Sequence, residues 1–167
     1  MKNTNLEFED IIGRYFNLKV KKQNYRIYVE EAGKGTPLLC LHTAGSDGRQ
    51  FRHILNDKKI TDNYRVIVFD LPWHGKSNPP EGYELNDYKL TTDLYKQIIM
   101  SFCEQYELKS PVIMGCSMGG RVVLHLALEQ GNYFRAVIAL EGADKLEPYY
   151  NLDWLYRPDV HGGLVQA

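Results

Sequence analysis

The octapeptide MGCSMGGR, residues 114–121, places Ser117 among three glycines directly after the apolar run PVIM. Glycine is favoured where the backbone takes unusual angles or passes close to another group. The group that approaches here is therefore a phosphate, a neighbouring backbone or a substrate. The stretches on both sides of the octapeptide, and the spacing inside it, indicate which of the three applies.

Continuous apolar runs, which are typical of strands buried on both faces, recur along the chain. They are TPLLCLH (36–42), YRVIVFDLP (64–72), SPVIMGCS (110–117) and FRAVIALEG (134–142). An earlier stretch, NYRIYVEEAGKG (24–35), alternates apolar and polar residues instead. This alternation predicts a half-exposed antiparallel strand with a glycine turn after it.

Helical patterns separate these runs. Apolar residues recur at every fourth position between residues 88 and 106, which predicts an amphipathic helix: Leu90, Leu94, Ile98 and Phe102. A second helical pattern follows the glycines of the octapeptide. Strands that alternate with helices predict an α/β fold, with a mainly parallel sheet and flanking helices. In such a sheet, function gathers at the carboxyl ends of the strands.

The glycine spacing fits one of three known motifs. Gly115 and Gly120 have the spacing of a phosphate-binding loop, but Arg121-Val122 stands where that loop needs Lys-Ser or Lys-Thr. A dinucleotide-binding G-x-G-x-x-G motif is absent. Residues 115–119 fulfil G-x-S-x-G, in which a serine occupies a tight turn from strand to helix. A glycine-rich turn in which the serine only caps the helix is the alternative.

Three stretches together resemble the α/β-hydrolase family, over about residues 20–145. LHTAGSDGRQF (41–51) is similar to the oxyanion-loop segment, FDLPWHGKS (69–77) to the loop after the fourth strand, and GCSMGG (115–120) to the nucleophile elbow. Trp73 replaces a glycine of the family pattern. The branch that resembles the chain most includes esterases, proline iminopeptidases, haloalkane dehalogenases and carbon–carbon-bond hydrolases.

The resemblance assigns roles to particular residues. Ser117 would be the nucleophile, and the backbone N–H groups of Met118 and Thr43 would form the oxyanion hole. Thr43 stands where many relatives have glycine, so its N–H is expected to be available. The resemblance implies motif or structural roles, not catalytic ones, for a further set of residues: His42, Asp70, His74, Gly75, Gly115 and Gly119.

A catalytic base and acid are harder to place. The family order is serine, then acid, then histidine. His42 and His74 belong to motif loops, His53 and His125 lie on helical patterns, and His161 lies in an irregular tail, so none is a convincing base. Glu141 follows the last strand, where a subset of relatives carries the acid; a solvent-facing or loop-capping glutamate is the alternative reading of this residue.

The predicted organisation is an α/β-hydrolase core over residues 1–145, followed by the start of a cap or lid over 146–167. The resemblance implies that the C-terminal strands and most of the cap are missing, as in the N-terminal part of a longer hydrolase. AVIAL (136–140) would then end the sheet as an unprotected apolar edge. We expect self-association through that edge.

Composition narrows the partners. The 167 residues are 44% hydrophobic and 25% charged, with a net charge of −1. This balance argues against nucleic-acid and membrane partners, and the sequence implies no metal or cofactor. Three cysteines without metal-like spacing predict buried, reduced thiols in a cytoplasmic protein: Cys40, Cys103 and Cys116.

The leading hypothesis is a hydrolase of a small-molecule ester, amide or carbon–carbon bond. The alternatives are a non-catalytic ligand-binding protein of the same fold and an inactive fragment that needs a complementary chain.

Overall fold

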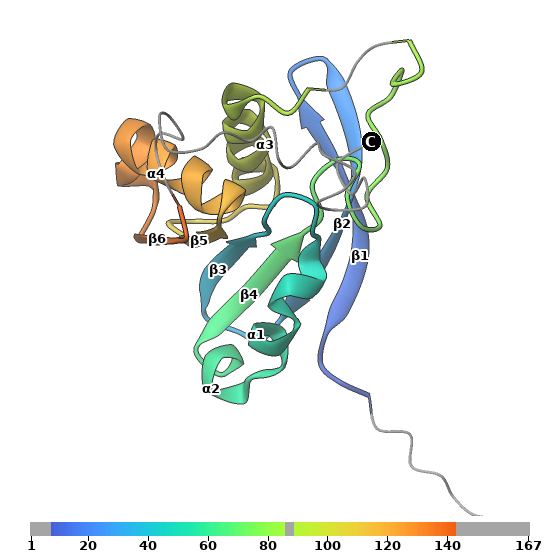
Figure 1. Cartoon of the computed structure of the whole chain (residues 1–167). Coiled ribbons are helices and arrows are strands. Elements are labelled where there is room, and N and C mark those ends of the chain that lie inside the picture. Colours follow the sequence, from blue (N-terminus) through green and yellow to red (C-terminus); the bar gives the residue numbers. More distant parts are fainter. Residues whose placement is uncertain (1–7, 86–88, 143–167) are drawn as a thin grey trace, which may run out of the picture.

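The computed structural model of the chain describes residues 8–85 and 89–142. Within them a six-stranded sheet has the order β1-β2-β4-β3-β5-β6 (Figure 1). The strands are β1 (Ile12–Val20), β2 (Gln23–Ala32), β3 (Thr36–Leu41), β4 (Tyr64–Phe69), β5 (Val112–Cys116) and β6 (Ala136–Leu140). β1 with β2 and β2 with β4 pair antiparallel, whereas β3 is parallel to β4 and to β5, and β5 is parallel to β6. The predicted α/β class with a mainly parallel sheet is confirmed.

β1 was not predicted from the sequence. Its apolar residues Phe16, Leu18 and Val20 do alternate, and the strand pairs along its whole length with β2. The turn between the two strands is Lys21-Lys22, with Lys21 at a φ of 54°. Two-residue hairpin turns usually contain Asn-Gly or a similar pair, by which they can be predicted from sequence. This turn contains no such pair.

Helices cover both faces of the sheet. α3 (Thr92–Gln105) and α4 (Met118–Gln130) pack on the face that receives Leu39 and Leu41 of β3. The 3-10 helix η1 (Gly48–Phe51) and helices α1 (Arg52–Asn56) and α2 (Lys58–Thr61) pack on the opposite face, with Leu38 and Cys40 of the same strand. In Figure 1 α1 and α2 lie across β4. A further 3-10 helix, η2 (Gly131–Tyr133), follows α4.

The predicted helix near 88–106 is present but begins later. Thr91 caps α3, because its side-chain oxygen accepts a hydrogen bond from the N–H of Leu94 at 3.1 Å. The predicted burial of the cysteines holds for two of the three. Burial raises the pKa of Cys40 and of Cys103 to about 12, whereas Cys116 is only half-buried.

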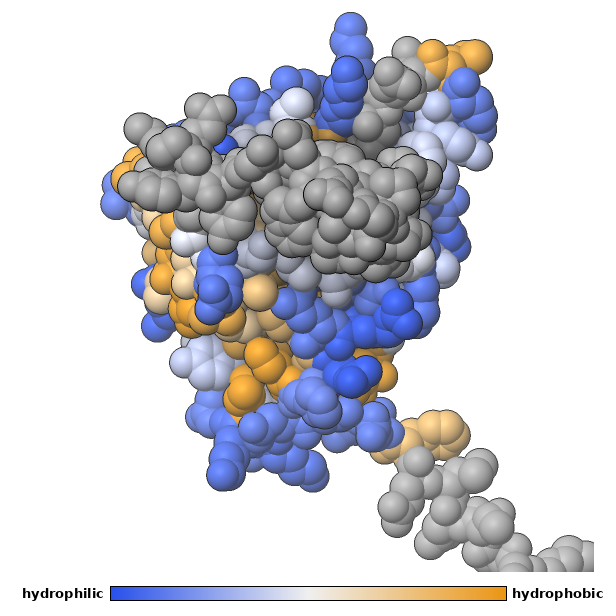
Figure 2. Space-filling view, viewed as in Figure 1, coloured by the Kyte–Doolittle hydropathy of each residue, from blue (hydrophilic) through white to orange (hydrophobic). Residues whose placement is uncertain are grey.

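The apolar run of β6 alone predicts a strand buried on both faces, whereas the family resemblance predicts that this strand is the unprotected edge of the sheet. Within the described residues it pairs only with β5, and Ile138 and Leu140 are 40% and 43% exposed. The apolar run therefore forms an edge strand. Figure 2 shows hydrophobic residues on the side of the molecule where β5 and β6 lie. The predicted cap segment, 146–167, lies outside the described residues.

Candidate active site

The loops that follow β3, β4, β5 and β6 meet at one edge of the sheet. The backbone of Gly119, at the start of α4, touches the carbonyl groups of Leu41 and His42 at the end of β3. The N–H of Leu71, after β4, donates to Nε2 of His42 at 3.1 Å. The N–H of Ser117 donates to the carbonyl of Leu140, the last residue of β6, at 2.8 Å. These contacts bring four loops, far apart in the sequence, around Ser117.

Ser117 occupies a tight turn between β5 and α4. Its φ and ψ are 52° and −108°, and its side chain is exposed. A non-glycine residue at this φ is strained and persists only when surrounding contacts hold it. Two backbone hydrogen bonds do so here: the N–H of Ser117 is bound by Leu140, and its carbonyl accepts from the N–H of Arg121 at 2.8 Å.

The three glycines around Ser117 admit neighbouring backbone. A Cβ on Gly115 would collide with the carbonyl of Gly119, the second residue of α4. A Cβ on Gly119 would lie 2.5 Å from the carbonyl oxygen of Leu41, and one on Gly120 would lie 2.6 Å from that of Leu140. β5, α4 and the ends of β3 and β6 therefore approach as closely as backbone allows. Ser117 does not cap the helix through its side chain, which removes the plain N-cap interpretation.

The two predicted oxyanion donors differ in their surroundings. Met118 is the first residue of α4, so its N–H is one of the first-turn groups without an acceptor inside the helix. The N–H of Thr43 donates to Oε1 of Gln50 at 2.9 Å, so it already has a side-chain acceptor, which the sequence did not predict. Gln50 was not predicted from the sequence as a site residue. No local pattern marks it, because the contact forms only when η1 folds back on the loop after β3.

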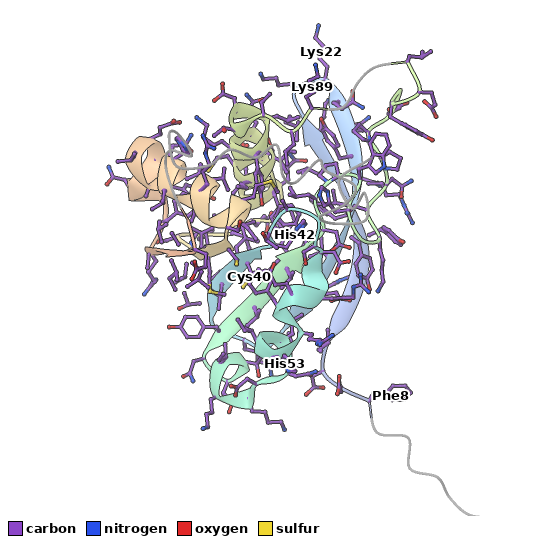
Figure 3. The ribbon with its side chains drawn as sticks, in the orientation of Figure 1. Phe8, Lys22, Cys40, His42, His53 and Lys89 are labelled. Carbon is purple, nitrogen blue, oxygen red and sulfur yellow. The ribbon has the colours of Figure 1, made fainter. Side chains whose placement is uncertain are left out.

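His42 has a different partner on each ring nitrogen. It is fully buried, Nε2 accepts from Leu71, and Nδ1 lies 2.8 Å from the carbonyl oxygen of Thr43. Because Nε2 accepts, Nδ1 must carry the proton. Burial, the largest cause, lowers the pKa of His42, which favours this neutral form. Figure 3 shows His42 well separated from the exposed His53 on α1.

His74 is likewise engaged with backbone. Its Nδ1 lies 3.0 Å from the carbonyl oxygen of Pro72, and its ring centroid is 5.1 Å from that of His42. His125 lies on α4, and its Nε2 is buried without a hydrogen-bond partner among the described residues. His161 lies outside the described residues. The part of the chain that the structure describes therefore brings no histidine to Ser117 as an evident base.

Asp70 ties two of the loops together. Its buried carboxylate accepts hydrogen bonds from the N–H of Gly48 at 2.7 Å and from the N–H of Lys76 at 2.8 Å. Gly75 packs against the same carboxylate. The hydroxyl of Ser77 donates to the carbonyl of Asp70 at 2.7 Å. The loops after β3 and β4 thus share one anchor beneath the site.

Glu141 lies beside the turn of Ser117. It follows β6 at a φ of 50°, and it is exposed. Its two chain neighbours both contact the elbow: Leu140 accepts from Ser117, and Gly142 lies against Gly120. The described ranges 8–85 and 89–142 contain no cluster of side chains suited to a metal ion. No helix within those ranges is long and apolar enough to cross a membrane.

Comparison with known proteins agrees with this architecture. The sequence profile of the alpha/beta hydrolase fold matches residues 36–159. "Uncharacterized hydrolase YugF" of Bacillus subtilis strain 168 is 28% identical over 86% of this chain and 55% of its own length. The "Pimeloyl-[acyl-carrier protein] methyl ester esterase" of Vibrio cholerae is 24% identical over 71% of this chain and 42% of its own length.

Solved structures show the same fold. A hydrolase from Pseudomonas aeruginosa PA01 superimposes with a TM-score of 0.70 at 18% identity, over 88% of this chain and 51% of that chain. The present chain thus spans about half the length of the proteins it matches. Because the family profile covers well over half of the chain, the protein belongs to the alpha/beta hydrolase fold family.

Proposed function

We propose that this chain carries the nucleophile of a serine hydrolase that cleaves a small-molecule ester, amide or carbon–carbon bond. One observation carries the proposal: Ser117 is held at a φ of 52° between a strand and a helix, with its side chain exposed. Strained non-glycine residues are concentrated at active sites, where the surrounding structure has to hold them. The name of the Vibrio cholerae relative makes ester hydrolysis the first activity to test.

In the proposed reaction Oγ of Ser117 attacks the substrate carbonyl, and a base takes the hydroxyl proton. A serine hydroxyl is a weak nucleophile without such a base. The carbonyl oxygen becomes an oxyanion, which the N–H groups of Met118 and Thr43 would stabilise, each worth about 3–4 kcal/mol. Met118 begins α4, so the positive end of the helix dipole also favours that charge.

Glu141 is the proposed orienting acid. An acid in this role hydrogen-bonds the catalytic histidine and stabilises the imidazolium that forms. The backbone contacts of Leu140 and Gly142 with the elbow support the assignment, since they keep Glu141 beside Ser117. We assign no base among the described residues, because His42 and His74 are bound to backbone carbonyls.

The engaged histidines favour a second candidate function, a non-catalytic protein that binds a ligand at the same site. Such a protein keeps the loops and loses turnover. The two candidates differ in the reactivity of Ser117, which is measured directly with a fluorophosphonate probe and intact-mass detection.

We expect only slow and weak labelling of the chain, because no base among the described residues activates the hydroxyl, and we expect Ser117→Ala to abolish it. Ser101→Ala, on α3, is the matched control and should label like the wild type. Labelling that survives Ser117→Ala would rule out Ser117 as the nucleophile. An unlabelled but folded wild type would favour the ligand-binding alternative.

A further inference from the structure

The N–H of Thr43 donates to Oε1 of Gln50 at 2.9 Å. This N–H is one of the two donors that the proposed function assigns to the oxyanion. A donor that already has an acceptor stabilises a second one only if the first leaves. The structure therefore raises the question of which of the two residues can move.

The backbone around Thr43 is bound on both sides. Its carbonyl lies 2.8 Å from Nδ1 of His42 and accepts from the N–H of Ser46 at 3.3 Å. The carbonyl of His42, which belongs to the same peptide unit as the N–H of Thr43, lies against Gly119. The direction of the Thr43 N–H is thus set by the buried ends of β3 and α4.

Gln50 is bound through its backbone, whereas its side chain is exposed. Its N–H donates to the carbonyl of Asp47 at 3.1 Å, and η1 is held further by Asp47 on the N–H of Arg49 and by Asp70 on the N–H of Gly48. The carboxamide of Gln50 can therefore rotate into solvent without any shift of η1.

We propose that the carboxamide oxygen of Gln50 holds the oxyanion position until the reaction begins and then gives up the Thr43 N–H to an oxygen that carries negative charge; this rests on the proposed function. Hydrogen bonds to an ionised acceptor are roughly twice as strong as those between neutral groups. A neutral substrate carbonyl competes with the carboxamide on equal terms, whereas an oxyanion displaces it. Gln50 is then a positioning residue that favours the transition state over the bound substrate, which is the difference that accelerates a reaction.

The first test measures hydrogen exchange of the Thr43 amide by nuclear magnetic resonance, which does not depend on activity. Gln50→Ala removes the acceptor, so exchange should become about fivefold faster or more. Gln130→Ala, at the exposed end of α4, is the matched control and should leave Thr43 unchanged. Equal exchange in the wild type and Gln50→Ala would overturn the proposal.

The second test measures the rate at which the fluorophosphonate labels Ser117. Oγ forms a bond to phosphorus, fluoride leaves, the hydroxyl proton passes to solvent, and the phosphoryl oxygen takes the oxyanion position. Gln50→Ala should label about threefold to fivefold faster, because the donor has no competing side chain. Gln50→Glu should label at least tenfold slower, because its carboxylate holds the N–H more strongly and repels the incoming negative oxygen.

The two variants are expected to change the labelling rate in opposite directions. This difference distinguishes release of the Thr43 N–H by Gln50 from a merely structural role of Gln50. If Gln50 only supported the loop, both variants would lower the rate, and equal losses in folded variants would overturn the proposal. If no variant labelled, wild type included, the proposed function would fail, and the release step with it. In that case hydrogen exchange of the Thr43 amide would still become faster in Gln50→Ala. Failure of the proposed function is thereby distinguished from absence of the hydrogen bond between Thr43 and Gln50.

Discussion

His42 shows how one buried side chain joins two loops of the site. Its protonated Nδ1 faces the carbonyl of Thr43, and its unprotonated Nε2 accepts from Leu71. A second proton on the ring would remove the acceptor for Leu71 and place a charge in the core. The neutral ring is therefore the form that holds the loops after β3 and β4 together, and this agrees with the direction in which burial shifts its pKa.

This lowered pKa predicts a pH-dependent stability. Below pH 6.5 the unfolded chain protonates His42 while the folded chain does not, so the unfolded state binds more protons and stability falls as pH falls. The fall is at most about 1.4 kcal/mol per pH unit for one group, and it stops at the folded pKa. Urea unfolding between pH 7.5 and 5 should show the wild type losing more stability than His42→Gln.

His42→Gln is expected to be less stable at pH 7.5 by about 1–3 kcal/mol, because it disturbs two buried hydrogen bonds. The gap between the two proteins should then narrow towards pH 5. Other titrating groups contribute equally to both proteins, so their effects cancel in the difference. Parallel stability curves would show that His42 does not titrate differently in the two states.

At the scale of elements, the elbow is a close junction of β5, α4 and the ends of β3 and β6. Side chains are missing where backbones touch, at Gly115, Gly119 and Gly120. The strained φ of Ser117 is thus maintained by packing of whole elements and by the hydrogen bonds to Leu140 and Arg121. A change at one of these glycines should act on the turn through the backbone.

Gly119→Ala should lower the free energy of unfolding by about 3 kcal/mol, because its Cβ would lie 2.5 Å from the carbonyl oxygen of Leu41. The higher helix propensity of alanine offsets only about 1 kcal/mol of this strain. Gly131→Ala is the matched control: it has a helical φ of −53° and no heavy atom within 4 Å of an added Cβ. It should be neutral or stabilising by about 0.5 kcal/mol. Similar unfolding midpoints for both variants would contradict the close junction.

At the scale of the whole molecule, the two edge strands of the sheet differ in their side chains. One edge is β1, which also pairs with a single strand among the described residues but carries charge: Arg14 of β1 and Arg65 of β4 both pair with the buried carboxylate of Glu31. The other edge strand is β6, whose exposed residues are apolar and whose outer edge pairs with no strand among the described residues. Strand edges without charges or proline tend to pair with other chains.

We predict that the chain self-associates through β6, and that Ile138→Lys reduces this association. Ile138 is 40% exposed, so the lysine can reach solvent with little loss of core packing. Leu128→Lys is the matched control, because Leu128 is 83% exposed on α4 and not on the strand edge. Light scattering should give a mass above 19.3 kDa for the wild type and for Leu128→Lys, and a lower mass for Ile138→Lys. A monomeric wild type would contradict the prediction.

The sequence by itself determined the features that depend on neighbours along the chain. The apolar runs of β3, β4 and β5 and the glycines around Ser117 are local signals, so the α/β class, the strand-to-helix turn and the family resemblance could be predicted. β1 was missed for the converse reason: its turn, Lys21-Lys22, lacks the usual residues, although its partner β2 was predicted correctly.

Only the tertiary structure decided which groups meet across long stretches of chain. It shows that the glycines admit the backbone of β3 and β6, and that Nε2 of His42 accepts from the N–H of Leu71. Both depend on the order of strands in the sheet. Residue type and spacing do not predict such contacts, because the free energy of these contacts arises from packing between segments that lie far apart in the sequence.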